Sequence, residues 1–290
     1  MQLSKLFSEK KIILIRRSTF KLVCVGILLA AFLWLLNSFY KEQAGTYFRV
    51  EELKEIHIAS TEYPYFSYRV HKPYATSFKE KSLFYKTASP VTDMPLYDYY
   101  TFTFSYEDQQ QILLHYSPTL NKVYNKHHLL EPSSALKEVL LDLAALYRQE
   151  VFKTYGALMV WEEVDKIFPM YATAKITDIY TSASFNVQRR EGSSHVDAQP
   201  LTAGDTAIMK KIYDGRWSWE RKGIIVEVRG RRIAASMNGM PHGSSKIDDN
   251  NFPGHFCIHF LGSTIHSGGM DIRHHREILK AAGKLPIDDD

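Results

Sequence analysis

Residues 237–243 read MNGMPHG, and residues 252–260 read FPGHFCIHF. These two segments hold three histidines and one of the two cysteines of the chain. Glycine and proline interrupt them, which indicates a tightly shaped loop. In the second segment His255, Cys257 and His259 alternate, so on a β-strand their side chains would share one face. A thiol between two imidazoles indicates either a nucleophile with its base or part of a metal site.

The chain of 290 residues is long enough for a sizeable core and one or two domains. Hydrophobic residues make up 45% of it, a proportion that argues against wholesale disorder.

An uncharged run of 19 residues, 22–40, follows a basic segment near the N-terminus. Its length suits a bilayer-spanning helix. The basic bias of residues 1–21 predicts a cytoplasmic tail, with the rest of the chain outside the cell membrane. A cleaved signal peptide is the alternative, but the basic segment is long and no small-x-small site follows closely. We therefore expect a single-pass anchor at 22–40.

The charge of the chain is concentrated in this segment. Residues 1–41 carry seven Lys or Arg and one acid, which leaves 29 basic and 31 acidic residues of the totals of 36 and 32. The outer part is therefore slightly acidic, and nucleic acid is not an expected partner.

The two cysteines are expected on different sides of this division. Cys24 lies within the predicted anchor, so Cys257 would be the sole thiol outside the membrane. It would then have no intramolecular disulfide partner there.

The patterns predict an α+β fold, with a mixed membrane-proximal domain over 45–170 and a β-rich, catalytic-type domain over 172–290. The predicted elements are strands at 99–106 and 111–116, a helix at 134–155 behind Ser133, a helix at 158–168, a hairpin of 175–180 with 184–190, a helix beginning at Thr202 and Asp205, strands at 224–229 and 231–237, and a last helix ending at Gly283.

Two chemistries suit the histidines around Cys257. In the first, Cys257 is a nucleophile, His255 takes its proton, and His242 approaches from the preceding loop. In the second, a zinc peptidase or amidase site draws on histidines and Asp197, although the sequence has no His-Glu-x-x-His. The first needs no cofactor and the second needs zinc.

His242-Gly243 followed by Gly254-His255-Phe256-Cys257-Ile258-His259 resembles the L,D-transpeptidase (YkuD-like) pattern, a His-Gly and then Ser/Thr-His-Gly-Cys. The resemblance covers about residues 220–262. It implies an acylated nucleophile at Cys257, a base at His255, a site-shaping role for His242, and peptidoglycan stem peptides as substrate. The chain departs from the family pattern at Gly254, Phe256 and His259.

Seven of the twelve histidines lie at or after His195, and several adjoin Gly, Ser or Asp. We expect substrate-binding roles for the residues His195, Asp197, His259, His266 and Arg190. A non-enzymatic alternative is a wall-binding or partner-binding membrane protein, in which Trp217, Trp219 and the aromatic segment 61–130 would stack on glycans.

Overall fold

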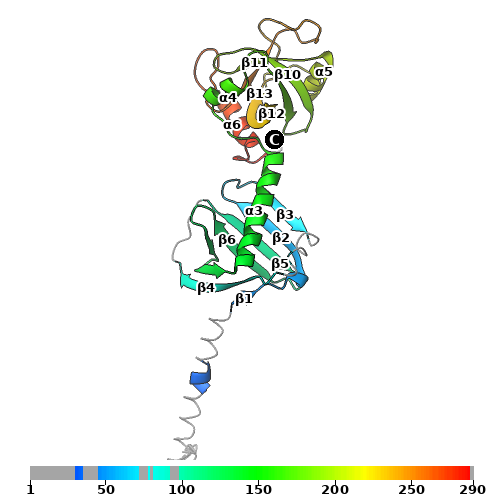
Figure 1. Cartoon of the computed structure of the whole chain (residues 1–290). Helices are drawn as coiled ribbons and strands as arrows, with labels where there is room; N and C mark the ends of the chain where they lie inside the picture. The colour runs from blue at the N-terminus through cyan, green and yellow to red at the C-terminus, as the bar shows by residue number, and fades with distance from the viewer. Residues whose placement is uncertain (1–29, 35–44, 72–77, 79–80, 92–97, 288–290) are drawn as a thin grey trace, which may run out of the picture.

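The computed structural model describes residues 30–34, 45–71, 78, 81–91 and 98–287. The fold is α+β and rich in strands, as predicted, with one eight-stranded sheet and one closed six-stranded barrel. Figure 1 shows the sheet and its long helix α3 below the barrel.

The first unit is an antiparallel sheet in the order β1-β4-β8-β7-β6-β5-β2-β3. Its elements are β1 (Thr46–Tyr47), the 3-10 helix η1 (Val50–Glu52), β2 (Leu53–Ser60), β3 (Ser67–His71), β4 (Phe84–Pro90), β5 (Tyr100–Tyr106), β6 (Gln111–Ser117), β7 (Lys122–Tyr124) and β8 (His128–Pro132). The predicted hairpin is confirmed, because β5 and β6 pair directly. Alternate residues of β5 are buried, as expected for a strand with one face on a core.

The helix predicted at 134–155 is confirmed as α3 (Ser134–Thr154), and it packs against this sheet. Its N-cap is Ser133, whose side chain accepts a hydrogen bond from the backbone N–H of Leu136 at 3.1 Å. Its buried stripe follows helical spacing and comprises Leu136, Val139, Leu140, Leu143, Ala144, Tyr147 and Val151.

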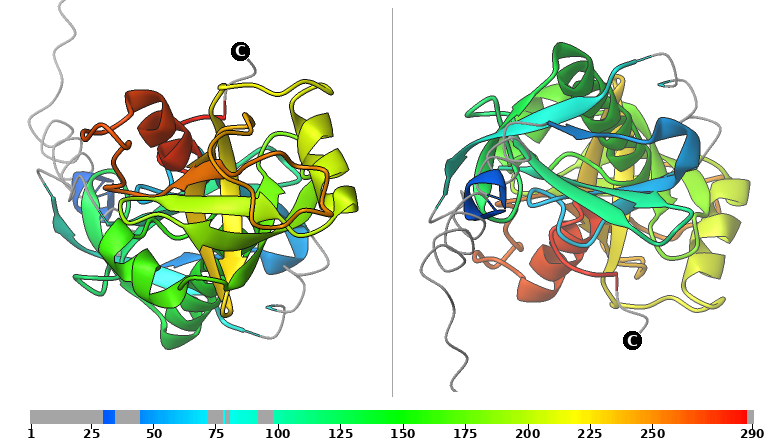
Figure 2. Two further views of the ribbon diagram at one scale, coloured as in Figure 1. Left: turned by 90° about the horizontal axis from the view of Figure 1, so that it is seen from above. Right: turned by 90° about the horizontal axis from the view of Figure 1, so that it is seen from below.

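The second unit is an antiparallel barrel closed in the order β10-β11-β14-β13-β12-β9. Its strands are β9 (Thr173–Asp178), β10 (Ser184–Glu191), β11 (Val196–Pro200), β12 (Lys222–Val228), β13 (Arg231–Met237) and β14 (Phe256–His259). Its helices are α4 (Trp161–Ile167), α5 (Ala203–Ile212) and α6 (Ile272–Ala281). Seen from above, α5 in yellow-green and α6 in red lie on opposite sides of the barrel (Figure 2). The predicted strand pairs and helices of this region are confirmed.

The predicted start of α5 is a complete capping box. The Thr202 side chain accepts a hydrogen bond from the Asp205 N–H at 3.1 Å, and the Asp205 carboxylate accepts one from the Thr202 N–H at 3.1 Å. Asp205 also accepts from the backbone N–H of Asn186, which ties the helix to β10.

The boundary between the two cores lies earlier in the chain than predicted. Trp161, Val164 and Phe168 belong to the core of the barrel, whereas Tyr155 belongs to that of the sheet. The predicted 45–170 domain therefore ends near residue 155, because α4 buries its apolar face against the second unit.

The predicted tail at 1–21 and most of the predicted anchor at 22–40 lie outside the described residues. Residues 30–34 are helical and exposed. Within the described ranges, no helix has the length and apolar character needed to cross a membrane.

A short connector joins the two units through the backbone. Ala157 pairs in parallel with Ile233 of β13, and Arg232 donates to the carbonyls of Phe152 and Lys153 at the end of α3. A Cβ on Gly156 would lie 2.3 Å from the backbone N of Ala234. The connector can dock this closely only because residue 156 has no side chain.

Replacing Gly156 by Ala is therefore expected to destabilise the protein by about 1–3 kcal/mol, since backbone must shift to relieve the overlap. Calorimetric unfolding would show a Tm lower by several degrees. Gly204→Ala is the matched control, because its Cβ would meet only the Thr202 hydroxyl, at 3.5 Å. Equal Tm values for the two variants would contradict the close docking of the connector.

Candidate active site

The pairing of β11 with β14 places Asp197 directly opposite Cys257. The neighbouring residues Phe256 and Ile258 point into the barrel core, so Cys257 and His259 point to the other face. The predicted alternation is thereby confirmed for this strand. Phe256, which departs from the family pattern, packs inward and does not cover the thiol.

The imidazole beside the thiol is that of His242. Its Nε2 lies 3.2 Å from Cys257 Sγ, and its Nδ1 lies 2.8 Å from the carbonyl oxygen of Met240. A carbonyl only accepts hydrogen bonds, so Nδ1 carries the proton and the Nε2 lone pair of neutral His242 faces the thiol. This is the arrangement of a base that takes the Cys257 proton.

His255, which the sequence predicted as the base, occupies a different position. Its Nε2 lies 3.7 Å from Asp197 Oδ1, and its ring packs edge-to-face on that of His242 at 4.6 Å. The structure therefore places His242, and not His255, in contact with the thiol.

Two glycines permit this arrangement. His242 and His255 exchange backbone hydrogen bonds of 2.9 and 2.8 Å. Gly254, at φ +125°, lies so close to His242 that a Cβ would be 2.4 Å from the His242 carbonyl oxygen. A Cβ on Gly243, at φ +65°, would lie 2.2 Å from the His255 ring. Larger residues would push the two imidazoles apart.

His195 and Asp197 form a buried ion pair on the other side of the thiol. His195 Nε2 lies 3.2 Å from Asp197 Oδ1, and its Nδ1 lies 2.8 Å from the Thr264 carbonyl oxygen. Because Nδ1 donates to that carbonyl, a neutral ring would turn its Nε2 lone pair toward the carboxylate. Burial opposes a charged ring, but contacts with Asp197 and then Cys257 outweigh it and raise the pKa of His195 to about 10.

The two imidazoles act on the thiol in the same direction. Burial raises the pKa of Cys257, but His195 and His242 outweigh burial and lower it below the ordinary value. The Cys257 contact is the main cause of the raised pKa of His242. Asp197 is buried, which raises its pKa, but His195 outweighs this and the net pKa is lowered. The site therefore favours a thiolate flanked by imidazolium groups.

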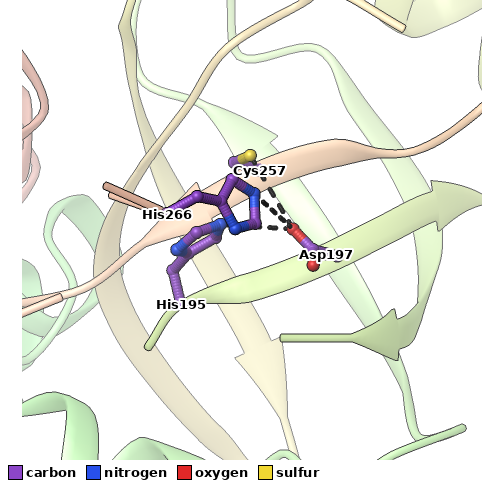
Figure 3. A group of neighbouring side chains, drawn as sticks. All are labelled: His195, Asp197, Cys257 and His266. Atoms are coloured by element: carbon purple, nitrogen blue, oxygen red, sulfur yellow. Dashed lines mark hydrogen bonds and ion pairs between the residues drawn. The ribbon is translucent and has the colours of Figure 1, made fainter. Parts of the chain in front are cut away.

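Figure 3 shows three interactions converging on the Asp197 carboxylate. Its Oδ1 lies 3.2 Å from His195 Nε2, 3.8 Å from Cys257 Sγ and 4.0 Å from His266 Nε2. The His266 side chain is 65% exposed, whereas Cys257 is only 5% exposed. A cavity of about 310 Å³ adjoins the group, with the further lining residues Met170, Glu191, Gly192, Ser193 and Ser194.

His259 lies behind the site and not in the cavity. Its ring stacks between those of His195, at 4.5 Å, and His274, at 3.9 Å. Burial lowers the pKa of His259 to about 2 and that of His274 to about 3, so both are neutral. The structure thus places His259 behind the His195 ring and outside the residues that line this cavity, and its substrate-binding role stays a prediction.

Arg190 is engaged elsewhere. It donates to the Gln188 side chain, and its guanidinium lies 5.1 Å above the ring of Tyr171. The neighbouring Arg189 is buried and donates to the carbonyl of Gly192 at 2.6 Å, which fixes the turn before His195. The structure thus gives Arg190 no contact that supports its predicted role.

The two tryptophans considered for glycan stacking have different surroundings. Trp219 is half exposed and lies 5.0 Å from the His242 ring, whereas Trp217 packs edge-on against Phe252. The sequence did not indicate the carbonyls of Met240 and Thr264 that orient the two imidazoles, because any residue carries a carbonyl. It also did not separate His274 from the other histidines of the last helix.

Comparison with protein-family models, with curated proteins and with solved structures finds no match to this chain. The cluster can form a thiolate–imidazolium pair, and it contains two sets of possible metal ligands. The first set is His195, Asp197, Cys257 and His266, and the second is His242, His255 and His266.

Alkylation of Cys257 by iodoacetamide should follow a pH curve with a midpoint below the ordinary thiol pKa, because the pKa of Cys257 is lowered. His195→Gln should move the midpoint upward by about 1–3 pH units, since it removes an adjacent positive charge. Rates would be measured by mass spectrometry of the peptide that contains Cys257.

His127→Gln is the control for this experiment, since His127 is exposed and lies in the sheet unit. An unchanged midpoint in His195→Gln would contradict the proposed charge on His195.

Proposed function

We propose that this protein is a thiol-dependent acyltransferase that acts on cell-wall peptides, with Cys257 as nucleophile and His242 as base. The observation that carries the proposal is the 3.2 Å approach of His242 Nε2 to Cys257 Sγ, with His242 Nδ1 fixed by the Met240 carbonyl. A nucleophile, a base and a group that orients the base are the parts of an activated-thiol site.

The reaction then has two steps. The Cys257 thiolate attacks a peptide carbonyl, His242 gives its proton to the departing amine, and a thioester forms. An acceptor amine next attacks the thioester, loses a proton to His242, and leaves with the acyl group. Water in place of the amine gives hydrolysis by the same route.

His195 and Asp197 have supporting roles in this scheme. The His195 imidazolium stabilises the thiolate before attack, and Asp197 keeps that ring charged. His259 and His274 hold the plane of the His195 ring by stacking.

The substrate class rests on the resemblance to L,D-transpeptidases, which implies peptidoglycan stem peptides. The cavity beside the cluster is compatible with a peptide, because it carries the Ser193 and Ser194 segment and the Glu191 carboxylate. The uncharged run at 22–40 supports an anchored protein whose two folded units lie outside the cell membrane.

A zinc-dependent peptidase or amidase is the second candidate. It is favoured by one observation, the donor atoms of His195, Asp197, Cys257 and His266 lying within 4.8 Å of one another. In such an enzyme a metal-bound water, and not the thiol, would attack the peptide.

Cys257→Ala should abolish acyl transfer from a stem tetrapeptide donor, and the thioester of the native protein should appear by mass spectrometry. His242→Gln should lower kcat by about 10²–10⁴, because it removes the base. His127→Gln is the control, and circular dichroism would verify the fold of each variant.

The metal candidate gives a different pattern in this assay. Cys257→Ala would lower activity in either case, because Cys257 is also one of the possible zinc ligands. Loss of native activity on chelation, its return with zinc and no thioester at any stage would show that the thiol is not the nucleophile.

A further inference from the structure

We infer that His195, Asp197, Cys257 and His266 form a binding site for one Zn²⁺ ion, and that the bound ion masks the thiol. The binding site stands on the geometry of the four side chains. The masking, and with it a regulatory role for zinc, rests on the proposed function of Cys257.

The spacing of the donor atoms suits a tetrahedral ion. Zinc bonds of about 2.0–2.3 Å separate tetrahedral ligand atoms by roughly 3.3–3.8 Å. From Asp197 Oδ1, the distances are 3.2 Å to His195 Nε2, 3.8 Å to Cys257 Sγ and 4.0 Å to His266 Nε2. Small rotations of exposed His266 would bring the outermost atom into range.

A second observation points to a ligand in the same place. His195 is 1% exposed, and none of the described residues gives its buried Nε2 a well-aligned hydrogen bond. Asp197 Oδ1 lies 3.2 Å from this nitrogen and forms an ion pair with the charged ring. A metal ion bound between the two would replace the ring proton and use both this nitrogen and the carboxylate oxygen.

His195 is also oriented as a metal ligand. Its Nδ1–H donates to the Thr264 carbonyl at 2.8 Å, which leaves Nε2 as the free donor atom of the neutral ring. Histidine ligands commonly donate their second N–H to a carbonyl or carboxylate in this way.

The donor set selects the metal. Thiolate and imidazole favour zinc over magnesium or calcium, which prefer oxygen ligands. The charges of Zn²⁺, the Cys257 thiolate and the Asp197 carboxylate sum to zero, so the buried site would be neutral. Binding displaces the proton on His195 Nε2 and any proton on the thiol, and both pass to the solvent.

Three of the ligands are held rigidly and one is not. Asp197 and Cys257 face each other on paired barrel strands, and His195 immediately precedes β11. His266 lies on an exposed loop that contains Gly262, Gly268 and Gly269. An ion would therefore enter and leave from the side of His266, and loss of that ligand would reopen the thiol.

The site can be tested on the purified full-length chain after treatment with a chelator. Titration with zinc chloride against a chromophoric chelator should give one ion per chain. Cobalt(II) should give tetrahedral d–d bands and a thiolate charge-transfer band. His266→Ala should weaken zinc affinity by at least about tenfold. His127→Ala should leave it unchanged.

His242→Gln separates the two possible ligand sets. His242 lies beside the thiol but is not one of the four proposed ligands. The variant should therefore bind zinc within a few-fold of the native affinity. Loss of binding in His242→Gln with retention in His195→Gln would overturn the assignment.

The masking is tested by acylation and by iodoacetamide labelling with and without zinc. Both should be suppressed by stoichiometric zinc and restored by chelation. Acylation without any zinc binding would overturn the inference and leave the proposed function intact. Zinc binding to a protein that never acylates would leave the metal site intact and overturn the proposed function and the masking. Activation by zinc would also overturn masking.

Discussion

The contact between Asp197 and His195 determines the charges of the whole site. A carboxylate that is almost fully buried is costly unless a cation compensates for it. The Thr264 carbonyl accepts from His195 Nδ1, so a neutral ring would point the Nε2 lone pair at the Asp197 carboxylate. Only the charged ring has a favourable contact with that carboxylate. The resulting imidazolium lowers the pKa of the neighbouring thiol, so the acidity of Cys257 follows from a charge that Asp197 created.

The barrel supplies the precision that this contact needs. Asp197 and Cys257 are register partners on β11 and β14, and closure of the sheet leaves neither strand a free edge. His242 reaches the thiol from outside the strands, through a two-residue bridge that depends on Gly243 and Gly254. Rigid strands thus hold one side of the thiol, and a glycine-dependent loop holds the other.

Local patterns in the sequence predicted much of the fold. The alternation at 255–259, the capped helix behind Ser133 and the Thr202 box depend on near neighbours, and all are present. The sequence did not predict strand β11 at 196–200, because all its residues are buried and no alternation of buried and exposed positions marks it. Which of His242 and His255 contacts the thiol depends on the backbone angles of Gly243 and Gly254, which local patterns do not reveal. The stacking of His274 on His259 joins elements far apart in the chain, so it could not be predicted either.

Hydrogen bonds at the connector join the sheet unit to the barrel unit. The last carbonyls of α3 receive hydrogen bonds from Arg232 of β13, and Lys284 donates back to the Glu62 carbonyl of the sheet. Strand β13 pairs in turn with β14, which carries Cys257. A force that tilts helix α3 would therefore reach Cys257 through only two strands, β13 and β14.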